Sequence, residues 1–171
     1  ILTKKTEFIP DIAQYAVAAI SRDTQICQTS TSGGAFTEIC RAFGDQDTAV
    51  FGAKFENLRV VHSSVIGVEN TQPLRKSKYV QSETGKSFAA AKAYLEESRK
   101  VVFSGTPCQI AGLRSFLGRD YENLLTIDFI CHGVGSPKVF EAALRHLSSV
   151  HGSRVVDYSF RNQVVRFGNR H

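Results

Sequence analysis

The sequence lacks the features that mark several large classes of protein. No hydrophobic run reaches the ~18–20 residues of a membrane span, and no basic segment followed by an apolar one opens the chain, so neither a membrane span nor secretion is expected. Methionine is absent and the chain starts at Ile1, which predicts a piece of a longer protein. Cysteine is scarce, with four residues among 171, so we expect no disulfide framework but reduced thiols in the cytoplasm.

The charge is modest and is not concentrated. The net charge is +5, and the basic residues form no stripe with interleaved aromatic residues. An anionic cofactor or partner explains this charge, and we expect no nucleic-acid binding. The share of apolar residues, 42%, is typical of a globular domain.

The pattern of apolar residues predicts a single α/β domain. It covers residues 15–171, follows an irregular lead-in over residues 1–14, and is expected to be incomplete at its C-terminal end. The predicted strands cover residues 15–20, 48–55, 58–66, 100–104, 124–130, 154–160 and 163–167, and the predicted helices cover residues 35–43, 86–99, 108–117 and 137–150. Strands and helices alternate in the second half, which favours a mixed sheet with helices packed on it; an α+β arrangement is the alternative.

Two strand-to-helix junctions in the second half share one design. VVFS leads into GTPC, LLTIDFI leads into CHGVGSP, and a helix follows each. In open α/β sheets ligands bind beyond the carboxyl ends of the strands, where helix starts offer free backbone N–H groups. Cys108 and Cys131 are therefore biased towards the thiolate, which binds metal or attacks an electrophile. No C-x-x-C is present, and metal sites of this kind take four ligands, so the two cysteines form half a site.

Each candidate also has a purely structural interpretation. Free cysteines are often small core residues, an explanation that suits Cys40 in its amphipathic helix and Cys27 before the Ser/Gly turn. The turn at Ser30–Gly34 could bring backbone donors to a phosphate, although such turns are more often helix caps. The polar cluster at 77–82 fits a solvated loop equally well. His132 is either an acid or hydrogen-bond donor, or a histidine satisfied by the backbone. The other histidines are predicted to be surface residues: His62, His146, His151 and His171.

The motifs together resemble one known family. SGGAF, VFGAKF, SKYVQS, VVFSGTPCQIAGLRSFL and DFICHGVGSPKVF are similar to the beta subunit of coenzyme F420 hydrogenase/dehydrogenase, from about Tyr15 to Phe160. The resemblance implies a flavoprotein with FAD and a 4Fe-4S cluster that passes electrons between a deazaflavin, or a carrier such as ferredoxin, and partner subunits.

The resemblance also implies roles for particular residues. Cys108 and Cys131 would be cluster ligands, with the remaining ligands in a C-x-x-C beyond His171. His132 would be a pocket residue or a donor next to the cluster, and the charge of Lys78 would favour the anionic reduced flavin. The implied flavin pocket consists of Ser32, Gly33, Gly34, Ser77, Lys78, Gln81, Gly105 and Thr106.

The chain departs from the family pattern in two places. Gly135 replaces a proline that the family commonly has after CHGV, and no ferredoxin-like cysteine run precedes the domain. The natural electron partner need not be F420. Two other functions stay open: an enzyme in which Cys108 is the nucleophile and His132 the base, and a binding or assembly module without cofactors.

Overall fold

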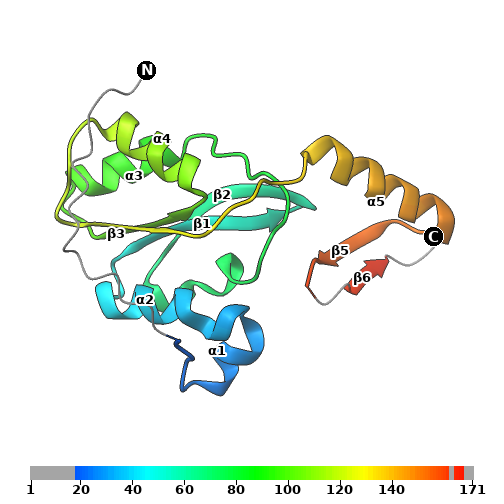
Figure 1. Ribbon diagram of the computed structural model, residues 1–171, viewed down its shortest axis with the longest axis horizontal. Helices are drawn as coiled ribbons and strands as arrows, with labels where there is room; N and C mark the ends of the chain where they lie inside the picture. The colour runs from blue at the N-terminus through cyan, green and yellow to red at the C-terminus, as the bar shows by residue number, and fades with distance from the viewer. Residues whose placement is uncertain (1–17, 162–163, 168–171) are drawn as a thin grey trace.

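The computed structural model describes residues 18–161 and 164–167, the latter as backbone only (Figure 1). In chain order the α-helices and strands are α1 (Thr24–Thr29), α2 (Ala35–Phe43), β1 (Ala49–Glu56), β2 (Arg59–Ile66), α3 (Ser87–Glu96), β3 (Val101–Gly105), α4 (Pro107–Leu117), β4 (Leu124–Asp128), α5 (Pro137–His151), β5 (Val155–Ser159) and β6 (Val164–Phe167). Within these residues no helix is both long and apolar enough to cross a membrane.

The main sheet is mixed and has the strand order β2-β1-β3-β4. β1 and β2 form an antiparallel hairpin, whereas β1, β3 and β4 run parallel to one another. β3 and β4 are joined through α4, as parallel neighbours require a crossover connection. The predicted α/β class, with helices packed on a mixed sheet, is confirmed.

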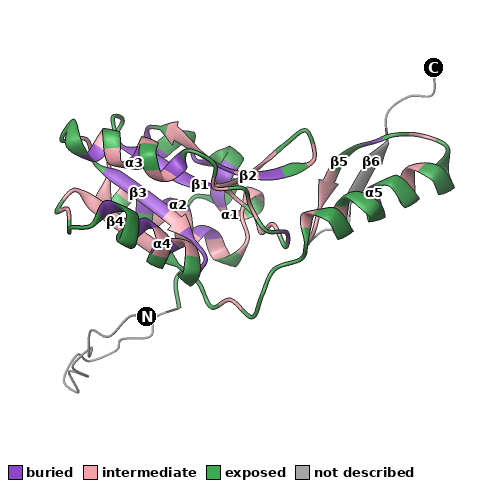
Figure 2. Cartoon of the chain, turned by 90° about the horizontal axis from the view of Figure 1, so that it is seen from above, coloured by how far each residue is buried: buried purple, intermediate pink, exposed green. Residues whose placement is uncertain are grey.

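Both faces of this sheet are covered by helices, because successive side chains along its strands point to opposite sides. Phe51 and Phe103 stack with ring centroids 5.3 Å apart, in a core that includes residues of α3 and α4. Val50 and Val102 point the other way, into a second core with Cys40 of α2. The sheet is therefore the middle layer of three (Figure 1), and its burial is greatest in the central strands β1 and β3 (Figure 2).

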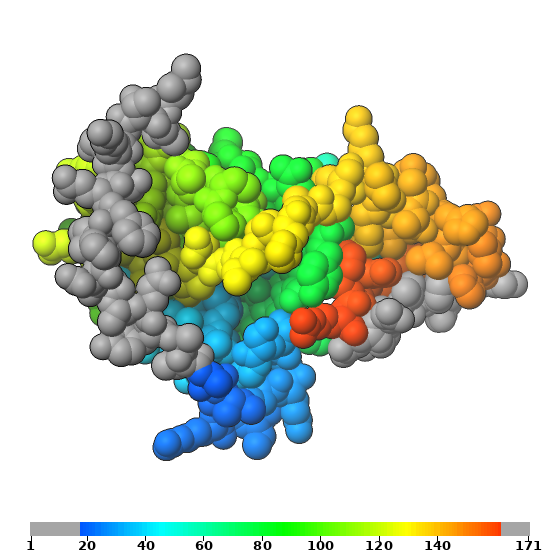
Figure 3. Space-filling model, viewed as in Figure 1, coloured from blue at the N-terminus to red at the C-terminus, as the bar shows by residue number. Residues whose placement is uncertain are grey.

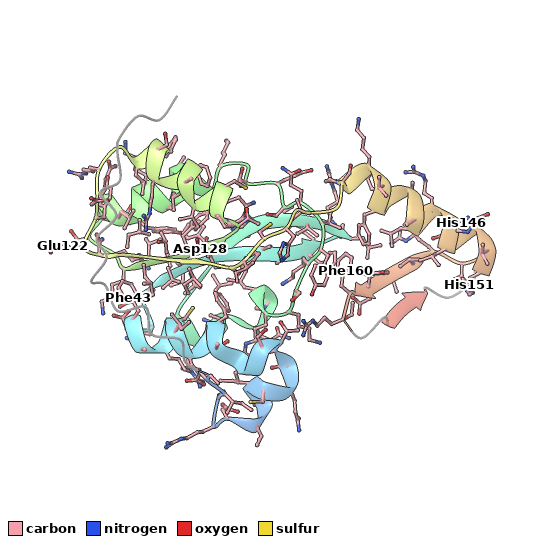
Figure 4. All side chains as sticks on the ribbon, in the orientation of Figure 1. Phe43, Glu122, Asp128, His146, His151 and Phe160 are labelled. Carbon is pink, nitrogen blue, oxygen red and sulfur yellow. The ribbon has the colours of Figure 1, made fainter. Side chains whose placement is uncertain are left out.

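A smaller unit lies beside the tip of the β1–β2 hairpin (Figure 1). It consists of α5 and the antiparallel pair β5–β6. Phe160 connects it to the hairpin, since its ring stacks on Phe55 at 6.0 Å and meets the edge of Tyr79 at 5.7 Å (Figure 4). Phe140 and Tyr158 complete this aromatic cluster. Aromatic pairs in such geometries add stability beyond the apolar area they bury.

Two expectations about local structure were wrong. Of the strand expected over residues 15–20, residues 18–20 lie outside any regular element and are exposed, and residues 15–17 fall outside the described residues. α1 was not predicted, although Asp23 caps it by accepting hydrogen bonds from the amides of Gln25 and Ile26 at 2.9 and 3.2 Å. Its single turn and a half is too short to show an apolar period.

Candidate functional site

The two cysteine junctions lie side by side at the carboxyl edge of the sheet. β3 and β4 pair in register up to Gly105 opposite Asp128, the residue labelled in Figure 4. Cys108 and Cys131 each come three residues after this last pair. Cys108 is exposed in the first turn of α4, and Cys131 is half-buried in the extended segment after β4.

The start of α4 is held by its own side chains. Thr106 and Gln109 form a capping box, in which Gln109 Oε1 accepts a hydrogen bond from the Thr106 amide at 3.0 Å. Pro107 occupies the first helical position, where its missing N–H costs nothing. The Thr106 hydroxyl lies 3.1 Å from the sulfur of Cys108. The position of this sulfur is therefore tied to the helix cap.

A buried histidine, predicted from the sequence to be a surface residue, connects this cap to the rest of the sheet. His62 is 8% exposed, and its Nε2 lies 2.7 Å from the carbonyl oxygen of Ser104. A carbonyl only accepts, so Nε2 carries the proton and Nδ1 accepts from Ser82 Oγ at 2.9 Å. Ser82 Oγ in turn accepts from Gln109 Nε2 at 2.9 Å. The prediction for His62 was wrong, and its signal was its position two residues after the buried Val60 on one strand.

This network has one consistent set of donors and acceptors when His62 is neutral. Burial is the main cause that lowers the pKa of its imidazole, against the hydrogen bond to Ser104, which raises it. The ring also stacks on Phe103, with centroids 5.1 Å apart. The neutral form is therefore the one that the packing and the hydrogen bonds favour together.

The segment at residues 77–82 touches each of the other predicted site segments. Ser77 Oγ lies 3.4 Å from Thr31 Oγ1, next to the Ser/Gly turn. The backbone N–H of Gln81 donates to the carbonyl oxygen of Gly135 at 3.0 Å, which pairs this segment with the chain after Cys131. Figure 3 shows this later stretch, in yellow, running over the surface towards α5 in orange. The structure thus brings together segments that are up to about a hundred residues apart in the sequence.

Lys78 lies in this segment, but its ammonium group turns back towards the preceding backbone. Nζ donates to the carbonyls of Pro73, Leu74 and Arg75 at 3.5, 3.1 and 2.5 Å. Burial first, and the charge of Lys76 second, lower the pKa of Lys78 to about 8. An ammonium group has three N–H donors, so these carbonyls engage all of them.

The Ser/Gly turn has the left-handed backbone that glycine favours. Gly33 and Gly34 have φ of 66° and 79°. A Cβ on Gly33 would lie 2.9 Å from the Ala19 carbonyl oxygen, and one on Gly34 would lie 2.7 Å from Ile26 Cγ2. These contacts alone explain both glycines by close packing against the α1 region. Ser32 is exposed at the start of the turn, also with positive φ.

The other two cysteines, Cys27 and Cys40, have surroundings that explain them as structural residues. Cys40 is fully buried, and burial raises the pKa of its thiol to about 12. The Cys27 thiol donates to the Ser21 carbonyl at 3.1 Å. Among the described residues no three Cys, His, Asp or Glu side chains gather as a metal would require. His132 lies exposed in the turn after Cys131.

The fold and the site define a mixed α/β domain with two thiols at the carboxyl edge of parallel strands. Residues 98–171, which contain both cysteine junctions, match the family model that describes the C-terminal part of the beta subunit of coenzyme F420 hydrogenase/dehydrogenase. This match confirms the resemblance of the sequence motifs to that beta subunit family.

The fold is also similar to that of a solved structure. A chain of the F420-reducing NiFe hydrogenase complex from Methanosarcina barkeri, solved with xenon, aligns with a TM-score of 0.56 and 17% sequence identity. The alignment covers 86% of the present chain and 57% of that chain, so the present chain spans little more than half its length. At this identity the likeness concerns the fold alone. No curated protein matches the chain.

The described residues fit the implied cofactors in part. Cys108 and Cys131 are two thiols at one sheet edge, which provides two of the four ligands of a cluster. Ser77, Gln81 and Thr106 lie on connected segments, as a flavin pocket requires. Ser30 Oγ, beside the Ser/Gly turn, is buried and has no hydrogen-bond partner among the described residues, so a bound polar group would satisfy it.

Proposed function

We propose that this chain is part of an oxidoreductase subunit that holds FAD and a 4Fe-4S cluster. It would pass electrons between a deazaflavin or ferredoxin-type carrier and a partner subunit. The observation that carries this proposal is the matched placement of Cys108 and Cys131, three residues beyond the paired ends of β3 and β4. The bound cofactors would supply the electron-transfer chemistry, and the protein would position them and tune their potentials.

The chain's own residues would divide this work between them. Cys108 and Cys131 would be two cluster ligands, and the Thr106 hydroxyl would donate towards the Cys108 sulfur. Hydrogen bonds to ligand sulfurs are one of the ways in which a protein sets a cluster potential. His132, next to Cys131, would be a donor near the cluster.

The flavin would lie against the segments that residues 77–82 connect. Its proposed contacts are Ser32, Gly33, Gly34, Ser77, Gln81, Gly105 and Thr106. Lys78 would act on it through its charge and not through a hydrogen bond, because its donors are engaged by backbone carbonyls. A positive charge in this place would favour the anionic reduced flavin.

The experiment that tests this function is anaerobic reconstitution of the full-length protein with FAD, iron and sulfide. We expect a visible absorbance spectrum of bound flavin that bleaches when a reduced deazaflavin or reduced ferredoxin is added. A protein that binds no flavin under these conditions would instead be a cofactor-free module, and the proposal would be wrong.

The alternative of a cysteine nucleophile finds no support in the geometry. The neighbour of the Cys108 sulfur is the Thr106 hydroxyl, which is not a base. In the described part of the chain no hydrogen bond joins Cys108 to His132 or to any other histidine. An activated cysteine needs such a base within hydrogen-bond reach.

A further inference from the structure

A second site lies at the tip of the β1–β2 hairpin and shares no lining residue with the cysteine junctions. A hollow of about 630 Å³ opens there between the hairpin turn, α5 and the start of β5. We propose that this hollow binds a mononucleotide-sized small molecule through its phosphate group. The site involves none of the residues assigned to the flavin or the cluster, so the inference does not depend on the proposed function.

Two arginines give the hollow its chemical character. Arg145 comes from α5 and Arg154 from the residue before β5, and both line the hollow. Neither guanidinium forms an ion pair within the part of the chain that the structure describes. A guanidinium presents a planar set of N–H donors that matches a phosphate with two parallel hydrogen bonds. Both arginines are exposed, and two such groups at one hollow without anionic partners among the described residues suit an anionic ligand.

A hydroxyl between the arginines adds a further donor. Ser148 lies one turn after Arg145 on α5 and lines the same hollow. Its Oγ accepts a hydrogen bond from the Val155 amide at 3.2 Å, so its position is fixed. Because the oxygen is the acceptor in that bond, its own proton can be donated to a ligand.

Apart from Asn57, the remaining wall of the hollow is apolar. Leu144 and Val155 are 8% and 1% exposed and form its floor, while Val156 and Leu58 lie towards the solvent. Ligand sites typically have volumes of roughly 300–1,000 Å³ and combine an apolar wall with a few polar groups that fix the orientation. The size and lining suit a small molecule with an apolar part and a phosphate.

The hairpin turn contributes an unusual leucine. Asn57 and Leu58 have φ of 50° and 63°, as in a two-residue type I′ turn, in which glycine commonly takes the second position. A bulky residue in this conformation is strained, and strained residues concentrate at ligand sites. Leu58 is half-buried and lines both this hollow and a smaller one next to Phe140. Its side chain thus closes the hollow on the hairpin side.

The test is calorimetric titration of the full-length protein with AMP and UMP. The affinity of each nucleotide is compared with that of its nucleoside, which lacks the phosphate. We expect both nucleotides to bind at least about tenfold more tightly than adenosine and uridine, because only the nucleotides carry a phosphate that the arginines can bind. Arg145→Gln and Arg154→Gln should each weaken AMP binding by about tenfold. Ser148→Ala should weaken it less.

Two controls separate this site from the cofactor site and from general charge. Arg119→Gln removes an exposed arginine that stacks on Tyr121, outside the hollow, and should leave AMP binding unchanged. Cys108→Ala should leave it unchanged too, whether or not the proposed cluster forms. AMP binding weaker than about 1 mM, equal binding of AMP and adenosine, or equal effects of R119Q and R145Q would each overturn the inference.

Discussion

His62 donates from Nε2 to the carbonyl oxygen of Ser104 across 2.7 Å, from a strand that is not adjacent to β3 in the sheet. Through Ser82 and Gln109 the same imidazole is linked to the start of α4, where the Thr106 hydroxyl meets Cys108. The position of the first proposed cluster ligand thus depends on a histidine far away in the sequence.

The stability of the protein should fall in mild acid because of His62. Its pKa in the folded protein is lowered from the ordinary 6.5, mainly by burial. As the pH falls through the ordinary value, the unfolded chain binds a proton that the folded chain resists, so the unfolded state gains stability. The contribution is complete above pH 6.5 and is lost progressively as the pH falls below it, towards the lowered pKa. Urea unfolding at a series of pH values measures it.

Two variants show whether His62 is the source. His62→Phe should remove this part of the pH dependence and cost about 1–3 kcal/mol at neutral pH, because Ser104 and Ser82 lose their partner. His146→Gln changes an exposed histidine on α5 and should keep the original pH profile (Figure 4). The assignment is wrong if His62→Phe retains the full pH dependence.

Gln109 should matter more than its half-exposed position on α4 suggests. Gln109→Ala removes its hydrogen bonds to the Thr106 amide and to Ser82, so we expect a loss of about 1–2 kcal/mol in the free energy of unfolding. Gln81→Ala is the matched control, since the contact of Gln81 with Gly135 runs through its backbone. Denaturant unfolding gives both values, and a loss of equal size in the two variants would contradict the proposed network.

Gly34 should tolerate alanine much less well than Gly85 does. Both have positive φ, but a Cβ on Gly34 would lie 2.7 Å from Ile26 Cγ2, whereas one on Gly85 would meet nothing within 4 Å. Gly85→Ala should therefore lower the free energy of unfolding only by the strain of placing alanine in a left-handed backbone conformation, about 1–2 kcal/mol. Gly34→Ala adds a steric clash and should cost roughly 2–4 kcal/mol. If thermal unfolding shows equal losses, close packing is not the reason for Gly34.

Phe160 should hold the α5 unit against the hairpin. Phe160→Ala removes ring contacts to Phe55, Tyr79 and Phe140, and we expect a loss of roughly 2 kcal/mol. Hydrogen exchange should become faster in α5 while the main sheet stays protected. Phe116→Ala, at a ring that is 49% exposed, should have a smaller effect and none on α5. Uniform exchange changes in both variants would refute the anchoring role.

The sequence was sufficient to predict the elements whose residues follow a clear period. The hairpin of β1 and β2, the helix α4 after GTP and the order of β3, α4 and β4 all depend on local patterns, and the structure has them at nearly the expected residues. The end of β4 at Asp128 was not predictable, because Phe129 and Ile130 are apolar yet 55% and 89% exposed. Hydrophobicity alone gives no reason for a strand to stop before such residues.

The candidate site was predictable as a set of segments but not as a set of contacts. The junctions containing Cys108 and Cys131 follow from strand-to-helix patterns, and parallel pairing brings them to one edge. The His62 network joins residues 20 and 42 positions apart, and such contacts depend on tertiary packing that no local pattern contains. Lys78 shows the same limit, since its sequence neighbours give no sign that its ammonium turns to the backbone.

The most direct test of the proposed function is the iron content of the full-length protein after anaerobic reconstitution with iron, sulfide and FAD. Cys108→Ala and Cys131→Ala should each lose most of the bound iron and the visible absorbance of the cluster, because each removes one of four ligands. Cys27→Ala, whose thiol contacts the Ser21 carbonyl, should bind as much iron as the unmodified protein. Full iron content in both the Cys108 and Cys131 variants would contradict the central claim.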